Sequence, residues 1–276
     1  MSTNTAPAPE PRPALVPPAD AAGLVDWMLD RIPAELEDPR LSEGARVLLR
    51  AYYHEAGLLD SGRRAFFDRH FREAMRLGLG EVLAGKPGRV LDLGSGLGTQ
   101  SFVFALAGAQ VTALDMDEAA CDALLERKAL LETDTGRALP IEVVRGDAFA
   151  RREAGGEPFD GAYSLFAFNM MLPTPRMVKA LSERTAPGAV VVIQDGDKRN
   201  LFKRFLEPRP DTLSPPELAA CFRENGFEHA FSKPAVAVPP QLWRVLPGGA
   251  ARALDSVTRS LPLMALSYVH GFRRLP

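Results

Sequence analysis

Short apolar runs alternate with helix-like segments between residues 89 and 195, and this alternation constrains the fold more than any other feature of the sequence. The runs expected to form strands lie at 89–94, 110–117, 141–148, 159–170 and 188–195. Helical spacing of apolar residues predicts helices between them at 99–108, 118–132 and 174–188. Strands that alternate with helices form βαβ units and a parallel sheet. The sequence therefore predicts an α/β fold with helices on both faces of the sheet.

The chain of 276 residues is expected to carry additions around this core. Residues 1–22 are rich in Pro and Ala, which predicts a disordered tail, and residues 23–84 have the apolar spacing of an N-terminal helical cap. Residues 85–276 would form the main domain, with an insertion near 238–262. In its C-terminal part, a well-capped helix is expected at 214–227, strands near 229–238 and 263–272, and one short helix between them.

Composition excludes several classes of function. A formal net charge of -2 argues against a strongly basic nucleic-acid binder. No apolar run has the length that spans a bilayer, and the first residues lack the basic and apolar regions of a secretory signal. Cys121 and Cys221 lie far apart without metal-ligand spacing and are expected to be reduced thiols. We therefore expect a cytoplasmic protein without membrane contact.

A glycine-rich loop follows the first strand of the core. In RVLDLGSGLGTQ (residues 89–100), Gly94, Gly96 and Gly98 stand between the apolar run and the next helix. A loop at the carboxyl end of a parallel strand is where open α/β sheets bind ligands. Glycines let a ligand lie against bare backbone, and the helix N-terminus adds free N–H groups.

The spacing of the loop indicates which ligand it suits. A dinucleotide fingerprint, GxGxxG, would need glycine at 99 or 101, where Thr99 and Ser101 stand. Asp92 opens the motif instead, and a carboxylate there would repel a pyrophosphate but attract an ammonium group. Asp115 ends the second strand, where a carboxylate can bind both ribose hydroxyls, and Asp147 ends the third. These acids together predict a nucleoside that carries an amino acid.

Four segments, in order, resemble the successive motifs of class I S-adenosylmethionine-dependent methyltransferases: VLDLGSGLGTQ, VTALDMD, VVRGDA and FDGAYSLFAFN. The resemblance spans about residues 88–195, and LSPPELAACFRENGF is similar to a late helix of that family. It implies a Rossmann-like, seven-stranded, mostly parallel sheet in the order 3-2-1-4-5-7-6, with one antiparallel strand. It also implies S-adenosylmethionine as the cofactor and residues 85–276 as the methyltransferase domain.

The resemblance assigns roles to residues of these motifs. Asp92 and the loop would line the methionine part of the cofactor, Asp115 would hold the ribose, and Met116 would cover the adenine. Asp147 and the Ala148 N–H would bind the adenine edge. The expected cofactor-binding residues are Asp92, Leu93, Gly94, Ser95, Gly96, Gly98, Asp115, Met116, Asp147, Ala148, Leu165 and Phe166, the last two beside the reacting methyl.

Two residues are candidates for catalysis. Histidine suits a general base near neutral pH, and His54 lies in the expected cap. Asn169 follows the fourth strand, where acceptors of this family bind, but N-M-M-L there lacks the Asp/Asn-Pro-Pro-aromatic motif of enzymes that methylate nucleic-acid amino groups. Asp195 and Asp197 would supply only half of a catechol-type metal site, so no metal is expected.

The sequence thus predicts a methyltransferase that acts on O, N or C of a small molecule, such as a secondary metabolite or quinone. Aromatic residues in the cap and insertion favour an apolar acceptor. Basic residues in 197–209 indicate a solvated helix face or a site for an anionic acceptor. A protein or RNA methyltransferase, an inactive cofactor-binding protein and a nicotinamide-dependent oxidoreductase remain alternatives. The oligomeric state stays open, with a homodimer among the options.

Overall fold

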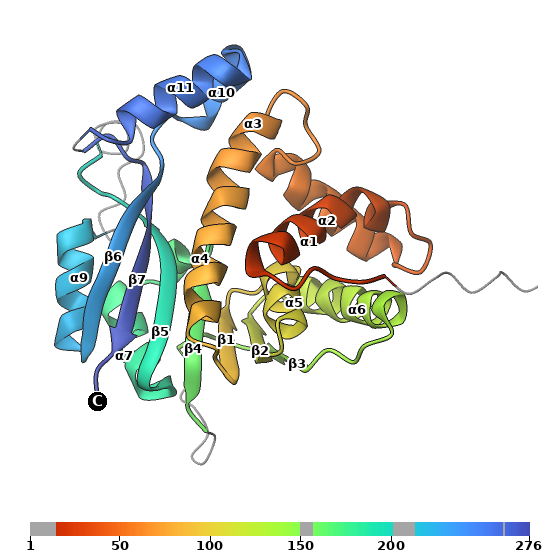
Figure 1. Cartoon of the computed structure of the whole chain (residues 1–276), viewed down its shortest axis with the longest axis horizontal. Coiled ribbons are helices and arrows are strands. Elements are labelled where there is room, and N and C mark those ends of the chain that lie inside the picture. Colours follow the sequence, from red (N-terminus) through yellow and green to blue (C-terminus); the bar gives the residue numbers. More distant parts are fainter. Residues whose placement is uncertain (1–14, 150–156, 201–212, 262) are drawn as a thin grey trace, which may run out of the picture.

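The computed structural model describes residues 15–149, 157–200, 213–261 and 263–276. A seven-stranded sheet lies between two layers of helices (Figure 1). Its strands are β1 (Arg89–Leu93), β2 (Gln110–Asp115), β3 (Ile141–Arg145), β4 (Phe159–Ser164), β5 (Thr185–Gly196), β6 (Phe227–Val236) and β7 (Ser267–Arg274). The order is β3-β2-β1-β4-β5-β7-β6, and β7 runs antiparallel to both β5 and β6. This confirms the sheet that the resemblance implies.

Both faces of the sheet are buried. Side chains along each strand alternate between the two faces. On β5, Val192 belongs to the core on one face, whereas Val191 and Ile193 belong to the core on the other. The first face is covered by α4 (Glu73–Ala84), α5 (Thr99–Leu106) and α6 (Glu118–Thr135). The second is covered by α7 (Thr174–Arg184) and α9 (Pro215–Glu224). The near-continuous apolar runs of the sequence follow from this double burial.

The N-terminal helices form a further layer over part of the first face. Helix α1 (Ala21–Leu36) packs on α5, and α2 (Glu43–Ala56) packs on α6 (Figure 1). Of the tail expected at 1–22, residues 1–14 lie outside the described residues. The rest is placed: the Leu15 N–H donates to the Asp134 carbonyl at 2.8 Å, and the Asp20 side chain caps α1.

A π-helical turn, Asp68–Arg72, joins α3 (Arg64–Phe67) to α4 in one continuous helix. The stretch expected as an insertion holds two helices, α10 (Pro240–Val245) and α11 (Gly248–Thr258), where one was expected. They lie beside α3 (Figure 1). Trp243 of α10 packs on Phe66 of α3 with ring centroids 5.9 Å apart. The insertion and α3 therefore share a small core at one end of the sheet.

Candidate functional site

The loop after β1 needs its glycines for two different reasons. Gly94, Gly96 and Gly98 have φ of 69°, 49° and 79°, in the left-handed region that side chains disfavour. A Cβ added to Gly98 would lie 2.5 Å from Leu124 Cγ, whereas one added to Gly96 would meet no atom within 4 Å. Gly98 therefore lets α5 and α6 pack closely, while Gly96 leaves open space above bare backbone.

The end of β2 holds this loop in place. Asp115 Oδ2 accepts a hydrogen bond from the Gly96 N–H at 2.7 Å, and its Oδ1 accepts one from the Asp117 N–H at 2.9 Å. The Leu114 carbonyl accepts from the N–H groups of Gly94 and Ser95 at 2.8 and 3.1 Å. The acid predicted to bind a ribose is thus already fixed against the loop predicted to bind the methionine part.

A cavity of about 390 Å³, here called the loop cavity, opens above these residues. It brings together the expected cofactor residues Gly94, Ser95, Gly96, Asp115, Met116, Leu165 and Phe166. The loop cavity is also lined by Tyr52, Tyr53 and Thr99, for which the sequence predicted no role in binding. The Ser95 hydroxyl is buried there and has no hydrogen-bond partner. A buried polar atom of this kind costs free energy unless a ligand satisfies it.

Five expected cofactor residues do not line the loop cavity. Leu93 and Gly98 are buried beneath the loop, and Asp92 is only 2% exposed. Asp147 is exposed, and its Oδ1 accepts from the Phe149 N–H at 2.8 Å. Ala148, beside it, packs against the second core. Asp147 and Ala148 therefore do not line the loop cavity, although the neighbouring Gly146 N–H donates to the Asp115 carbonyl at 2.9 Å.

Asp92 is a buried acid whose pKa lies well above its ordinary value. Its Oδ2 accepts a hydrogen bond from Ser101 Oγ at 2.6 Å. Burial raises the pKa of the Asp92 carboxyl to about 7; the nearby Asp115 charge adds to this effect and the Ser101 hydrogen bond opposes it. The residue that opens the glycine motif therefore acts from below the loop.

A buried ion pair connects the N-terminal helices to the same loop. Arg127 of α6 donates to Glu35 Oε2 of α1 at 2.7 Å, and the side chains are 1% and 5% exposed. Arg127 also donates to the Leu97 carbonyl and, at 3.0 Å, to Thr99 Oγ1, which is hydrogen-bonded to the Tyr53 hydroxyl. Sequence reasoning missed this network, whose only signal was a charged residue on the apolar face of a helix.

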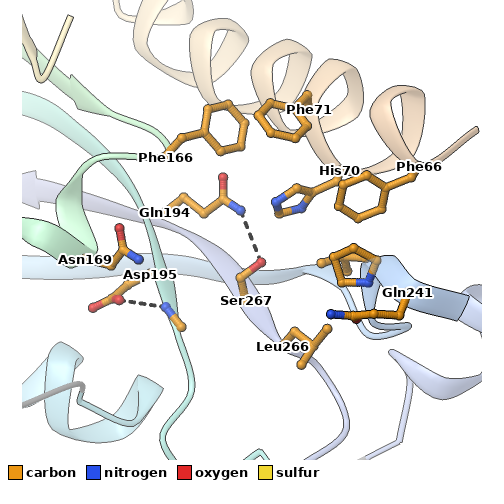
Figure 2. Close-up of a pocket in the computed structure, with 13 residues that line it drawn as sticks. Phe66, His70, Phe71, Phe166, Asn169, Gln194, Asp195, Gln241, Leu266 and Ser267 are labelled. Atoms are coloured by element: carbon orange, nitrogen blue, oxygen red, sulfur yellow. Dashed lines mark hydrogen bonds between the residues drawn. The ribbon is translucent and has the colours of Figure 1, made fainter. Parts of the chain in front are cut away.

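Figure 2 shows a second cavity, of about 350 Å³, here called the aromatic cavity. Phe166, with a left-handed φ of 66°, lines both cavities. Other residues of the aromatic cavity are Phe66, His70, Phe71, Asn169, Gln194, Asp195, Gln241 and Ser267. The backbone strain at Phe166 costs on the order of 1–3 kcal/mol, which is typical of functional sites. The two cavities therefore meet at one strained residue.

The structure separates the two catalytic candidates. Asn169 lines the aromatic cavity, whereas His54 is exposed on α2 and lines neither the loop cavity nor the aromatic cavity. His70, on the π-helical turn, is the histidine that the structure places in the aromatic cavity. Sequence reasoning also missed Gln194 and Ser267, which β5 and β7 bring together; a lone glutamine after VVVI was the available signal.

The basic segment 197–209 is described only as far as residue 200. Lys198 Nζ pairs with Glu217 at 2.6 Å, and Arg199 pairs with Asp197 at 2.9 Å. Neither cation lines the aromatic cavity. Lys203, Arg204 and Arg209 lie outside the described residues. The two described cations of this segment therefore form local ion pairs and do not line the aromatic cavity.

Comparison with known proteins decides the family. A family model described as a methyltransferase domain matches residues 67–230, more than half of the chain. The chain belongs to this methyltransferase family. It is a class I, S-adenosylmethionine-dependent enzyme, which confirms the resemblance and replaces the nicotinamide-dependent alternative. No match was found among curated protein sequences.

Solved structures share the methyltransferase's fold at low identity. NodS from Bradyrhizobium japonicum, an N-methyltransferase in complex with S-adenosyl-L-homocysteine, is 14% identical with a TM-score of 0.52, over 90% of this chain and 98% of NodS. A putative sarcosine dimethylglycine methyltransferase from Galdieria sulphuraria is 17% identical with a TM-score of 0.53, over 85% and 99%. The CcbJ methyltransferase from Streptomyces caelestis is 16% identical with a TM-score of 0.51, over 72% and 88%.

The loop cavity of the methyltransferase fits its cofactor. Bare backbone at Gly96, the carboxylate of Asp115 and the orphaned Ser95 hydroxyl offer space and hydrogen-bond partners for a nucleoside with a charged amino acid. Among the described residues, no three His, Cys, Asp or Glu side chains are grouped to hold a metal ion. None of the helices in the described ranges combines the length and hydropathy needed to cross a membrane.

Proposed function

We propose that this methyltransferase methylates a small molecule that binds in the aromatic cavity. The observation that carries the proposal is the sharing of Phe166 by the two cavities. A donor in the loop cavity and an acceptor in the aromatic cavity would meet at this residue. A volume of about 350 Å³ lies in the range of small-molecule pockets, about 300–1,000 Å³.

Each cofactor contact is part of the same proposal. S-adenosylmethionine supplies an activated methyl group on a sulfonium. We propose that Asp115 binds the ribose, Met116 covers the adenine, and the loop from Gly94 to Gly98 lies along the methionine part. Leu165 and Phe166 would border the methyl. Leu93, Asp92 and Gly98 would act by shaping the loop, while Asp147 and Ala148 would reach the adenine from the end of β3.

The N-terminal helices would form the cap that closes over both ligands. Tyr52 and Tyr53 of α2 line the loop cavity. Phe66 of α3 and His70 and Phe71 of the π-helical turn line the aromatic cavity, so successive helices of the cap line the two cavities. A closed cap excludes water and aligns donor with acceptor, which can lower a barrier by about 7–11 kcal/mol. A cytoplasmic location, with the free thiols of Cys121 and Cys221 reduced, stays a prediction.

A protein or RNA substrate is the second candidate. It would have to insert a side chain or base into the aromatic cavity, which the described residues line mainly with aromatic and polar neutral groups. A nucleic-acid substrate would bind with strong salt dependence. The net charge of -2 disfavours that partner. An inactive cofactor-binding protein would bind the cofactor and transfer nothing.

A mass-shift screen tests the proposal. The chain is incubated with a metabolite library and S-adenosylmethionine carrying a labelled methyl, and products that gain one methyl are identified. Binding of S-adenosyl-L-homocysteine is measured in parallel by calorimetry. A methylated metabolite supports the proposal. Cofactor binding with methylation of only protein or RNA overturns it, and the absence of cofactor binding would overturn the assigned loop cavity.

A further inference from the structure

One polar atom of the aromatic cavity lacks a partner. Gln194 is 5% exposed, and its Nε2 donates to Ser267 Oγ at 3.1 Å. Its Oε1 is buried and accepts no hydrogen bond. Figure 2 shows this oxygen pointing away from Ser267, toward the side of Phe166 and Phe71. Leaving a buried acceptor unsatisfied costs about 1–3 kcal/mol, so the cavity is built to receive a hydrogen-bond donor.

Aromatic rings form the opposite wall. The rings of Phe71 and Phe166 have centroids 4.3 Å apart, and the His70 ring lies 5.6 Å from that of Phe166 and 5.1 Å from that of Phe66. These rings come from three parts of the structure: α3, the π-helical turn that follows it, and the residues after β4, far along the chain. Aromatic pairs add about 0.5–1.5 kcal/mol beyond their buried area. This wall favours a flat aromatic ligand.

The charge of the cavity restricts the ligand further. Asp195 of β5 is the only carboxylate among its described residues, no Lys or Arg lines it there, and His70 is the only other titratable group. Asp195 Oδ1 accepts from the Gly196 N–H at 2.6 Å. An acceptor carboxylate or phosphate would find no Lys or Arg among the described lining residues to pair with, whereas a neutral molecule needs none.

We propose that the acceptor is a neutral aromatic compound with a hydroxyl group, and that His70 is its general base; this rests on the proposed function. The ring lies against Phe71 and Phe166, and the hydroxyl lies between Gln194 and His70. The phenolic oxygen forms a bond to the methyl carbon while the bond from that carbon to sulfur breaks. The hydroxyl donates its single proton to Gln194 Oε1 when the acceptor binds, and rotation about the C–O bond turns that proton to His70 for the reaction. Sulfur keeps the electron pair, the phenolic proton passes to His70, and solvent takes it after the transfer.

Binding is tested first, by calorimetry with S-adenosyl-L-homocysteine present. The probes are 2-naphthol, 2-methoxynaphthalene, which lacks the donor, and 2-naphthoate, which is anionic. We expect wild type to bind 2-naphthol at least about tenfold more tightly than either analogue. In Gln194→Met, of similar length but apolar, the tenfold preference over 2-methoxynaphthalene should disappear. Equal binding of the three by wild type overturns the proposal, as does an undiminished preference in Gln194→Met.

Catalysis is tested with phenols of different acidity. His70→Ala should lose about 10²-fold or more in kcat with 2-naphthol, as expected for a general base. With 4-cyanophenol, which is more acidic but still un-ionised at neutral pH, the loss should be clearly smaller, because a more acidic hydroxyl depends less on a base to remove its proton. His229→Ala, which changes an exposed histidine of β6, is the control and should keep wild-type rates. An equal loss with both phenols shows a structural role and overturns the base assignment.

Two controls keep the test decisive. His70→Gln replaces His70→Ala if the latter fails to bind S-adenosyl-L-homocysteine with wild-type affinity. If wild type binds S-adenosyl-L-homocysteine but none of the phenols, or if the mass-shift screen finds only amines methylated, the acceptor class is wrong while the proposed function stands. If S-adenosyl-L-homocysteine does not bind at all, the proposed function fails first.

Discussion

Asp115 and Gly96 are joined by a hydrogen bond of 2.7 Å from the glycine N–H to the carboxylate. The acid that ends β2 and the loop that follows β1 therefore form one wall of the loop cavity. A parallel pairing in which Leu93 lies opposite Leu114 puts the two strand ends at the same edge of the sheet. The geometry shows that Asp115 supports the loop, and its proposed contact with the ribose would be a second role.

Replacing Asp115 by Ala should lower the affinity for S-adenosylmethionine by at least about tenfold, or about 1.4 kcal/mol. Both the ribose contact and the support of Gly96 are lost. Calorimetric titration gives the affinity, and urea unfolding checks the fold. Asp122→Ala removes an exposed acid of α6 paired with Arg145 and should leave the affinity unchanged. Unchanged affinity in Asp115→Ala would place the ribose elsewhere.

Two glycines of the loop should respond differently to a methyl group. Gly98→Ala should lower the free energy of unfolding by about 1–3 kcal/mol, because of its left-handed φ and the clash with Leu124. Gly96→Ala has open space, so its stability loss should be smaller, about 1 kcal/mol. Its cofactor affinity should fall instead, since the methyl group enters the loop cavity. Urea unfolding measures the stability of both variants, and calorimetry measures their affinity for the cofactor. Equal losses of stability and of affinity in the two variants would contradict the prediction.

Asp92 should make stability depend on pH. Its folded-state pKa of about 7 lies above the ordinary 3.8, so the folded protein holds a proton that the unfolded chain has lost. This contribution is complete below about pH 4, declines as pH rises toward 7 and is gone above it. Relative to Asp92→Asn, wild type should therefore lose about 2–3 kcal/mol between about pH 5 and pH 8. Parallel urea titrations at the two pH values show this, and a constant difference would contradict it.

Removing one partner of the ion pair between Arg127 and Glu35 should lower the free energy of unfolding. Arg127→Met leaves the buried Glu35 carboxylate with only a long contact to Arg31, at 3.9 Å, and should destabilise the fold by about 3–5 kcal/mol. The double variant Arg127→Met with Glu35→Met removes both charges and should recover most of that loss. Urea unfolding of the two singles and the double closes the cycle. If the double variant is as unstable as the sum of the singles, the pair is not the source of the effect.

The sequence alone determined the sheet, the cofactor class and the residues nearest the glycine loop. The alternating apolar runs predicted a parallel sheet, because such patterns are local and each strand buries side chains on both faces. The strand order came from the resemblance of the motifs to a known family. Gly94, Gly96 and Asp115 could be named in advance because they end neighbouring strands. His54 was a candidate in the same way, because it lies in an expected helix of the cap. The sequence does not show which face of that helix points toward the cofactor.

Tertiary structure decided the rest. Gln194 and Ser267 are 73 positions apart in the chain, and only the antiparallel pairing of β5 with β7 brings them together. His70 enters the aromatic cavity because a π-helical turn and the packing of α3 on α10 set its direction, whereas His54 stays exposed. Arg127 meets Glu35 across 92 positions in a layer that no local pattern encodes. Local patterns specify where strands end, but which side chains face each other across a cavity depends on how distant segments pack.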